Sequence, residues 1–271
     1  MFFRTAILVL AICSPVVATE TTSGPIVDVL ADAAKLPSIE IPAQKPLMSA
    51  ELALDTYQKN AKRQSEILDE YEDSTTIEAE LPKLSKKGRF ELKRVFTAPK
   101  SLAFKAVDFV GDGFVKTNVI ARLLQSEMDH VRKDDAKATA INSENYKFSY
   151  KGYDVVDVRT VHAFQVRPRK KRQGLFKGKI YLDAYTGSIV RAEGRLVKSP
   201  SVFIKRIDFV QDYTQVGEFN LISHIHSTAE TRLVGPTVVN ITHSDYRPKS
   251  VTPVATTSTG GMSPMPAAYN F

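Results

Sequence analysis

The stretch Leu175–Tyr213 decides the fold and reads LFKGKIYLDAYTGSIVRAEGRLVKSPSVFIKRIDFVQDY. Apolar and polar residues alternate along its first part, with Ile180, Leu182 and Ala184 set against Lys179, Tyr181 and Asp183. Its second part sets Val190, Ala192, Gly194 and Leu196 against Arg191, Glu193, Arg195 and Val197. A period of two places apolar side chains on one face of a strand. The turn residues 185–188 between the two parts predict an antiparallel hairpin with one apolar and one solvated face.

The composition is that of a globular protein. The chain has 271 residues, of which 43% are hydrophobic and 25% charged, and its net charge is +7. This length accommodates one large domain or two small ones. Because acidic residues are interspersed with the basic ones, the charge alone does not predict nucleic-acid binding.

The N-terminus has the pattern of a cleavable export signal. Arg4 gives a positive start, residues 5–17 are apolar but too short to span a bilayer, and residues 16–18 suit cleavage after Ala18. Cys13, the only cysteine, would be removed with this segment. An alternative, in which Cys13 is lipidated, stays open. We therefore expect a periplasmic protein without disulfides or thiolate chemistry.

Four segments are expected in all: a signal peptide (1–18), a proline-rich linker or arm (19–48), one folded domain (49–247) and a disordered tail (248–271). Helical spacing of apolar residues predicts one helix over 49–71, with Ser49 as its N-cap, and a second over 114–133. The remaining segments read as strands, which we place at 75–81, 89–97, 101–109, 145–151, 155–166, 217–233 and 237–246, besides those of the opening stretch. An antiparallel sheet of about ten strands must curl or split.

We therefore predict an α+β fold. It is a curved, incompletely closed antiparallel β-sheet, a half-barrel, with helices packed on its concave face.

Several strand sequences resemble those of exported bacterial proteins of the outer-membrane lipoprotein-sorting type, which have the lipoprotein-carrier fold. They are Asn145–Gly152, Arg167–Lys170, Leu175–Asp183 and Gly194–Ser201, running on to Phe209 and Tyr213. The resemblance covers about residues 49–246. It implies an unclosed barrel around helices whose apolar cavity holds the acyl chains of a lipid or lipoprotein. The charge-rich first helix and the long tail depart from the best-known carrier.

Candidate site residues follow from this interpretation. The candidates for a ligand cavity are Phe96, Phe104, Phe148, Phe164, Ile180, Leu182, Leu196, Phe203 and Phe209, although apolar residues of this kind equally form an ordinary core. The candidates for a lid helix are Ile120, Leu124 and Met128. The candidates for contact with anionic headgroups or an acidic partner are Arg167, Arg169, Lys170, Lys171 and Arg172, with a solvated hairpin tip as the alternative.

Metal binding and catalysis find little support. His224 and His226 share one strand face, and a zinc site would need a further ligand such as Glu230, His243 or Asp245, which nothing in the sequence aligns. No G-x-S-x-G, P-loop, H-E-x-x-H or G-x-G-x-x-G motif is present. We predict a non-enzymatic monomer without cofactor, metal or nucleic acid, which carries a lipid or acylated lipoprotein and contacts membranes peripherally or not at all. The alternative is a protein-interaction or envelope-stress sensor module that binds an envelope membrane complex.

Overall fold

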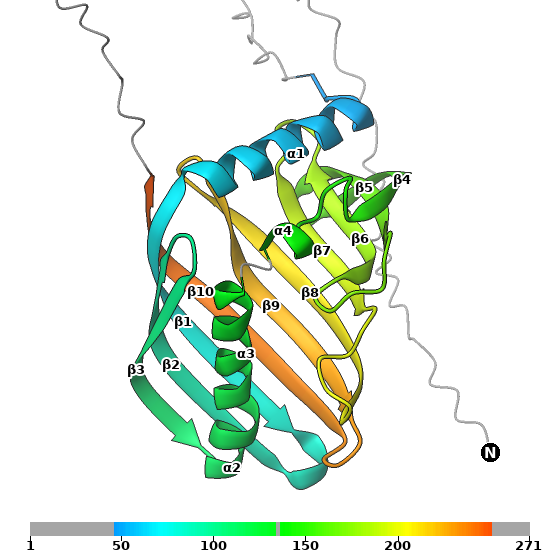
Figure 1. Ribbon diagram of the computed structural model, residues 1–271. Helices are drawn as coiled ribbons and strands as arrows, with labels where there is room; N and C mark the ends of the chain where they lie inside the picture. The colour runs from blue at the N-terminus through cyan, green and yellow to red at the C-terminus, as the bar shows by residue number, and fades with distance from the viewer. Residues whose placement is uncertain (1–45, 134–135, 251–271) are drawn as a thin grey trace, which may run out of the picture. The chain divides into compact units, whose positions relative to one another are not determined.

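The computed structural model describes residues 46–133 and 136–250, and the predicted signal segment, most of the linker and most of the tail lie outside these residues (Figure 1). The described chain forms one open, ten-stranded antiparallel sheet, which confirms the predicted fold class. Its strand order is β3-β2-β1-β10-β9-β8-β7-β6-β5-β4. Because β3 and β4 do not pair with each other, the sheet has two edges. None of the described helices is long and apolar enough to span a membrane.

The strands are long and joined mostly by tight turns. Their bounds are β1 Leu68–Leu81, β2 Lys86–Thr97, β3 Ser101–Gly111, β4 Tyr146–Val156, β5 Arg159–Pro168, β6 Phe176–Asp183, β7 Ile189–Leu196, β8 Ile204–Val216, β9 Phe219–Thr231 and β10 Pro236–Ser250. The first and last strands in the sequence, β1 and β10, pair with each other at the centre of the sheet. This long-range pairing joins a β1–β3 meander to a β4–β10 meander.

The helices lie on one face of this sheet, as Figure 1 shows for α1 and α3. Helix α1 (Ala50–Ile67) starts at the predicted N-cap, where the Ser49 hydroxyl accepts a hydrogen bond of 3.2 Å from the Leu52 amide. The second helical segment comprises α2 (Gly113–Val115), a π-helical turn (Lys116–Ile120) and α3 (Ala121–Arg132). Two further short helical elements are the 3₁₀ turn Pro82–Leu84 and α4 (Ala136–Thr139).

Two separate apolar cores hold the helices to the sheet. Beneath α1, Ala50 and Tyr57 pack against β4–β7 in a cluster whose largest buried members include Tyr146, Phe164, Ile180 and Leu182. Beneath α2 and α3, a second cluster comprises Ile77, Ala79, Leu81, Leu92, Val115, Ile120 and Val239. The two helical segments therefore cover the concave face, and each packs on a separate apolar cluster.

β-Bulges change the faces that simple alternation predicts. In β6 and β7, Tyr181 pairs with Arg191 while Leu182 pairs with Ile189, so Val190 is an extra residue. Alternation predicted that Val190 shares a face with Ala192. The structure instead packs Val190 with Tyr181 in a small cluster on the outer face. The outer face is thus partly apolar, with Val156, Val161 and Ala163 completing the cluster.

Several predicted boundaries were wrong. The first helix ends at Ile67, since residues 68–71 pair with β2 and β10 in β1. Residues 155–156 belong to β4, and a turn separates them from β5. Strand β10 continues to Ser250, beyond the predicted strand end at 246, and its last residues pair with β1.

Candidate functional site

The candidate site is the part of the concave face that lies under α3. Its floor is made of apolar residues from four strands, β1, β2, β3 and β10, and includes Ile77, Leu92, Phe104, Val239 and Ile241. We call this floor the α3 surface. In Figure 1, α3 lies over these strands.

Helix α3 covers this floor loosely. Leu123 and Leu124 pack against the α3 surface, but none of the twelve residues of α3 is fully buried. By contrast, Val115 and Ile120, which precede α3, are 0% and 1% exposed. The segment is therefore anchored firmly at its N-terminal end, and the helix that follows is not.

The N-terminal anchor has a clear local cause. The Asp112 carboxylate accepts a hydrogen bond of 2.8 Å from the Phe114 amide and contacts the Lys86 ammonium at 3.0 Å. The hydrogen bond from Lys86, followed by that from the Phe114 amide, lowers the pKa of Asp112. A negative charge at this end also suits the helix dipole. The π-helical turn Lys116–Ile120 lies directly after this anchor and before α3.

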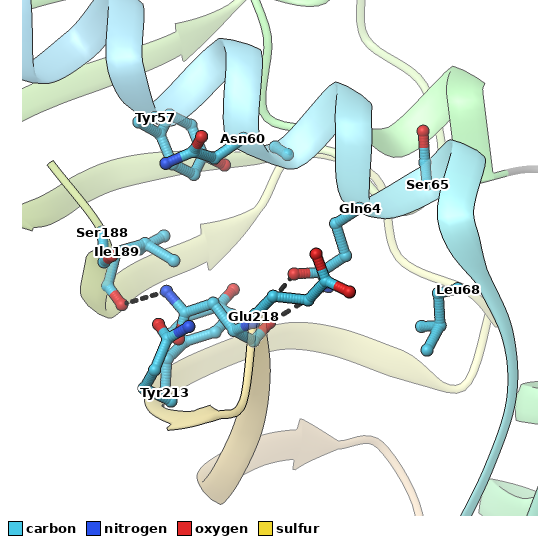
Figure 2. Close-up of a pocket in the computed structure, with 12 residues that line it drawn as sticks. Tyr57, Asn60, Gln64, Ser65, Leu68, Ser188, Ile189, Tyr213 and Glu218 are labelled. Atoms are coloured by element: carbon cyan, nitrogen blue, oxygen red, sulfur yellow. Dashed lines mark hydrogen bonds between the residues drawn. The ribbon is translucent and has the colours of Figure 1, made fainter. Parts of the chain in front are cut away.

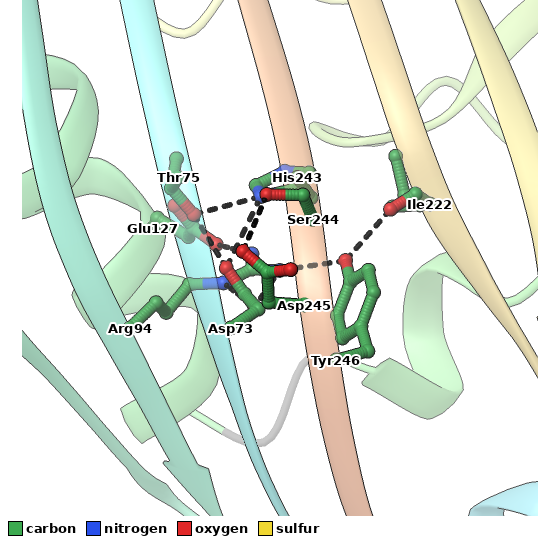
Figure 3. Close-up of polar contacts among 9 residues, drawn as sticks. All are labelled: Asp73, Thr75, Arg94, Glu127, Ile222, His243, Ser244, Asp245 and Tyr246. Carbon is green, nitrogen blue, oxygen red and sulfur yellow. Dashed lines mark hydrogen bonds and ion pairs between the residues drawn. The ribbon is translucent and has the colours of Figure 1, made fainter.

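A buried polar network on the sheet contacts the middle of α3 through Glu127 (Figure 3). Its centre is Arg94 of β2, whose side chain is 7% exposed. The Arg94 guanidinium donates to the Asp73 carboxylate at 2.8 Å and to the Glu127 carboxylate, on α3, at 2.8 Å. It also donates to the Tyr246 hydroxyl at 3.0 Å, which in turn donates to the backbone carbonyl of Ile222 at 2.7 Å. One cation thus connects α3 with β1, β2, β10 and β9.

Aromatic rings surround this cation. The Arg94 guanidinium lies 5.3 Å from the centre of the Tyr71 ring, a distance at which a cation is attracted to the ring face. Tyr71 stacks on Phe96 at 5.1 Å and meets the edge of Tyr246 at 5.8 Å. Burial raises the pKa of Tyr71 to about 12, so this phenol stays neutral.

His243 completes the network next to Asp73. The Thr75 hydroxyl donates to the Asp73 carboxylate at 2.5 Å and lies 2.9 Å from His243 Nδ1. Because the single hydroxyl hydrogen of Thr75 is directed to Asp73, the contact with His243 requires a hydrogen on Nδ1. Burial lowers the pKa of His243, and the hydrogen bond with Asp73 offsets this only in part. His243 is therefore a neutral donor at neutral pH.

The charge of Asp73 is stabilised by its partners. Burial alone would raise the pKa of this carboxyl, but the hydrogen bond from His243 and the charge of Arg94 outweigh burial and hold the pKa below its usual range. The network therefore contains two carboxylates and one guanidinium. It is a closed set of hydrogen bonds that holds elements together, and it leaves neither a nucleophile nor a free acid facing solvent.

The predicted cavity residues are divided between the two cores. Phe164, Ile180 and Leu182 are buried under α1, with Phe148, Leu196 and Phe209 packed beside them. Phe104 lies in the α3 surface and Phe96 stacks on Tyr71. Phe203 lies in the loop before β8 and is 54% exposed. Of the predicted lid residues, Ile120 is in the π-helical turn, and Leu124 and Met128 are partly buried on α3.

Two members of the basic run have structural partners. The Arg169 side chain donates to the Ser143 carbonyl at 2.8 Å. The Arg172 guanidinium donates to the Ala138 carbonyl and to the Asn145 side-chain oxygen, both at 2.8 Å. These contacts hold the α4 segment against the start of β4. The side chains of Arg167, Lys170 and Lys171 are exposed.

The histidine pair lies on the outer face. His224 Nδ1 is 3.2 Å from the Thr242 hydroxyl and His226 Nδ1 is 2.7 Å from the Asn240 side-chain oxygen, each the cross-strand neighbour of its histidine. His243 lies on the opposite, concave face, so the sheet separates it from the pair. Among the described residues, no group of three or more His, Cys, Asp or Glu side chains is arranged to hold a metal ion.

Sequence interpretation missed the Arg94 network, although a signal for it exists. Asp73 and Thr75 precede Ile77, Ala79 and Leu81 at the same spacing of two, and Arg94 follows Leu92 in the same way. Polar residues in register with an apolar face are costly to bury unless they are paired. Such positions identify the network once the strands are known.

Comparison with known proteins gave matches among solved structures only. No family model matches the chain, and no curated protein matches it. A DUF1329 family protein from Desulfovibrio piger is 11% identical with a TM-score of 0.39, over 73% of this chain and 92% of that one. A putative outer membrane lipoprotein-sorting protein domain from Vibrio parahaemolyticus is 12% identical with a TM-score of 0.37, over 73% and 92%. A LolA superfamily protein from Nitrosomonas europaea is 11% identical with a TM-score of 0.36, over 72% and 94%. The lipoprotein-sorting class named from the sequence is thus among the structures that the chain resembles.

Proposed function

We propose that the protein is a periplasmic carrier that holds the acyl chain of a lipid or lipoprotein on the α3 surface. The location rests on the export pattern of residues 1–18, which lie outside the described residues. The carrier function rests on the geometry of α3. An apolar floor, next to the Arg94 network, lies under a helix that has no fully buried residue of its own.

Helix α3 acts as the lid in this proposal. Its N-terminal end is anchored by Asp112, Val115 and Ile120, while its only charged tie to the sheet, among the described contacts, is the pair of Glu127 and Arg94. The π-helical turn at 116–120 is the hinge, since irregular turns of this kind frequently mark functional sites in helices. Displacement of α3 exposes the floor to an acyl chain.

The free energy gained by burying an acyl chain is comparable to the free energy lost when α3 moves away. Burial of an alkyl chain contributes about 0.8 kcal/mol for each methylene. An acyl chain therefore offsets the contacts that the half-buried Leu123 and Leu124 lose when α3 moves away. The Glu127 side chain is 36% exposed, so its ion pair with Arg94 holds the lid only modestly.

Native mass spectrometry of protein purified without detergent tests this function. Bound lipid or acylated peptide, identified by solvent extraction, is the expected result. A protein that is purified without lipid and does not take up a fluorescent fatty acid would remove the carrier proposal.

An interaction module is the second candidate, because one edge strand carries exposed apolar side chains. On β4, Tyr150, Tyr153 and Val155 are 42%, 56% and 65% exposed, and the outer edge of this strand has no partner strand among the described residues. The basic tip at Lys170 and Lys171 lies beyond the adjoining strand β5. A partner with an acidic extended segment suits this edge.

Charge reversal of Lys170 and Lys171 separates the two functions. Arg169 and Arg172 are left unchanged because they hold the α4 segment. If the protein is a carrier, the Lys170→Glu/Lys171→Glu variant keeps its bound lipid. If the protein is an interaction module, this variant loses its envelope partner in a pull-down experiment.

A further inference from the structure

A hollow lies away from the α3 surface, between α1 and the β8–β9 hairpin. Its volume is about 250 Å³, and its lining comes from the last turns of α1, the start of β7 and the hairpin. Figure 2 shows Tyr57 and Gln64 on α1 above this space and Tyr213 on the strand below it. The hollow is smaller than the about 300–1,000 Å³ typical of sites for drug-sized ligands.

Two tyrosine hydroxyls line the hollow without a hydrogen-bond partner. Tyr57 is only 8% exposed, and neither its hydroxyl nor that of Tyr213 bonds to any described residue. Among the described residues, every polar side-chain atom that is shut off from solvent has a partner. Both hydroxyls are therefore accessible to solvent, and both residues line the hollow. Each hydroxyl is available for a hydrogen bond to a polar ligand that takes the place of solvent there.

The tyrosine hydroxyls are neutral donors. Burial, together with the proximity of Tyr213 and Tyr146, raises the pKa of Tyr57 well above its ordinary value. Burial and the proximity of Tyr146 raise the pKa of Tyr213 in the same way. Each group therefore donates one hydrogen and accepts others at any physiological pH.

The other polar groups around the hollow are also uncharged. The side-chain amide of Asn60 and the hydroxyl of Ser188 have no hydrogen-bond partner among the described residues. Gln64 is already occupied, since its amide donates to the Asn220 carbonyl at 3.2 Å and accepts from the Asn220 backbone at 2.8 Å.

Charge hardly contributes to the lining. Glu218 is the one charged lining residue, and it forms an ion pair of 2.8 Å with Arg63 at the surface. No lysine or arginine lines the hollow. Its polar groups are thus hydroxyls and amides, placed above apolar surface from Ile189, Leu68 and the two tyrosine rings.

We propose that this hollow binds a single neutral, hydroxylated ring of the size of a hexose. Hydroxyl and amide groups match the alternating donors and acceptors of a polyol, and the apolar surface matches the C–H face of the ring. An anionic ligand is disfavoured because no cation lines the hollow. A bare acyl chain is disfavoured because it would leave both tyrosine hydroxyls without partners. The site is separate from the α3 surface and does not depend on the carrier function.

Saturation-transfer difference NMR on the whole protein tests the proposal. The probes are D-glucose, methyl β-D-glucopyranoside and glucose 6-phosphate, at millimolar concentration. We expect transfer to the two neutral sugars and none to the phosphate. A glycoside that binds as well as glucose identifies the ring as part of a larger glycan, whereas loss of binding on methylation identifies a free sugar.

Tyrosine-to-phenylalanine variants test whether the sugar binds in this hollow. Tyr57→Phe and Tyr213→Phe should each weaken sugar binding about tenfold, because each removes one hydrogen bond to the ligand. Their thermal midpoints should not fall, since neither hydroxyl has a protein partner to lose. Tyr181→Phe is the matched control. Its hydroxyl donates to Glu193 on the outer face at 2.7 Å, so sugar binding should be unchanged.

Three results would overturn the assignment. One is the absence of transfer to either neutral sugar in the wild-type protein. Another is transfer that persists in the Tyr57→Phe/Tyr213→Phe double variant, which would place the sugar elsewhere. The third is transfer to glucose 6-phosphate alone, which would mean that charge and not the uncharged lining determines binding.

Discussion

At the scale of single residues, Arg94 is the side chain on which most of the buried polar network depends. Among the residues that the structure describes, it is the only cation that contacts Asp73, whose side chain is 0% exposed. Removal of one partner of a buried ion pair leaves an uncompensated charge, which costs far more than the pair contributes when it is intact. The network therefore makes a specific prediction about stability.

The variant Arg94→Met should lower the free energy of unfolding by about 3–5 kcal/mol. Urea denaturation measures this loss. The double variant Arg94→Met/Asp73→Asn removes both charges and should recover a large part of it. An Arg94→Met protein as stable as the wild type would show that Asp73 is not charged in the folded protein.

His243 predicts a pH dependence. Burial lowers its pKa, so the unfolded chain binds the proton more readily than the folded protein does. Its contribution to stability is complete above about pH 6.5, the ordinary value, and is lost as the pH falls from there through the folded pKa. Asp73, whose pKa is also lowered, adds a separate loss that begins only below about pH 4.

Urea midpoints between pH 8 and pH 3 measure both losses. The variant His243→Asn keeps an N–H group for Thr75 but cannot titrate, so the loss between pH 6.5 and pH 5 should shrink. If wild type and variant had the same profile, the titrating group would be another histidine.

At the scale of elements, Arg169 and Arg172 of the basic run serve as a structural clamp. Arg172 joins the α4 segment to the start of β4 through the Ala138 carbonyl and the Asn145 side chain. The variant Arg172→Met should therefore speed hydrogen exchange at the amides of residues 142–146, as measured by mass spectrometry. Lys171→Met, at an exposed neighbour, is the control and should leave exchange unchanged. Equal rates in all three proteins would refute the clamp.

Helix α3 should open more readily when its polar tie is weakened. Glu127→Gln removes the charge that Arg94 contacts, so exchange in residues 121–132 should rise several-fold while that in α1 stays the same. Asp129→Asn is the matched control. It removes the same charge from the same helix, but the described partners of the Asp129 side chain, Gln125 and Arg132, belong to α3 itself. An equal increase in both variants would mean that helix charge, and not the tie, governs opening.

The sequence predicts elements well where the period is unbroken. The β6–β7 hairpin and the Ser49 cap follow from alternation, turn residues and helical spacing. β-Bulges cannot be predicted in this way. One extra residue such as Val190 reverses which face the following side chains occupy, while the composition of the strand stays the same. The pairing of β1 with β10 and the contacts of Arg94 join residues that are far apart in the sequence, and no local signal specifies them.

At the scale of the whole described chain, the concave face is divided into two regions. Helix α1 covers one with buried side chains such as Ala53 and Tyr57, and the other lies under α3, which buries none of its residues fully. The predicted cavity residues were taken from both regions, because alternation does not distinguish a filled core from a covered binding surface. The burial of the two helices does distinguish them, and for this reason the proposed acyl-chain site is the α3 surface.

Photo-cross-linking with a diazirine-bearing palmitic acid tests this central claim most directly. Peptides that carry the label, identified by mass spectrometry, should come from β1, β2 and β10 around Ile77, Leu92 and Val239, and labelling should be reduced by excess unlabelled palmitic acid. Labelling confined to the region under α1 or to surface loops, or labelling that excess palmitic acid does not reduce, would contradict the account.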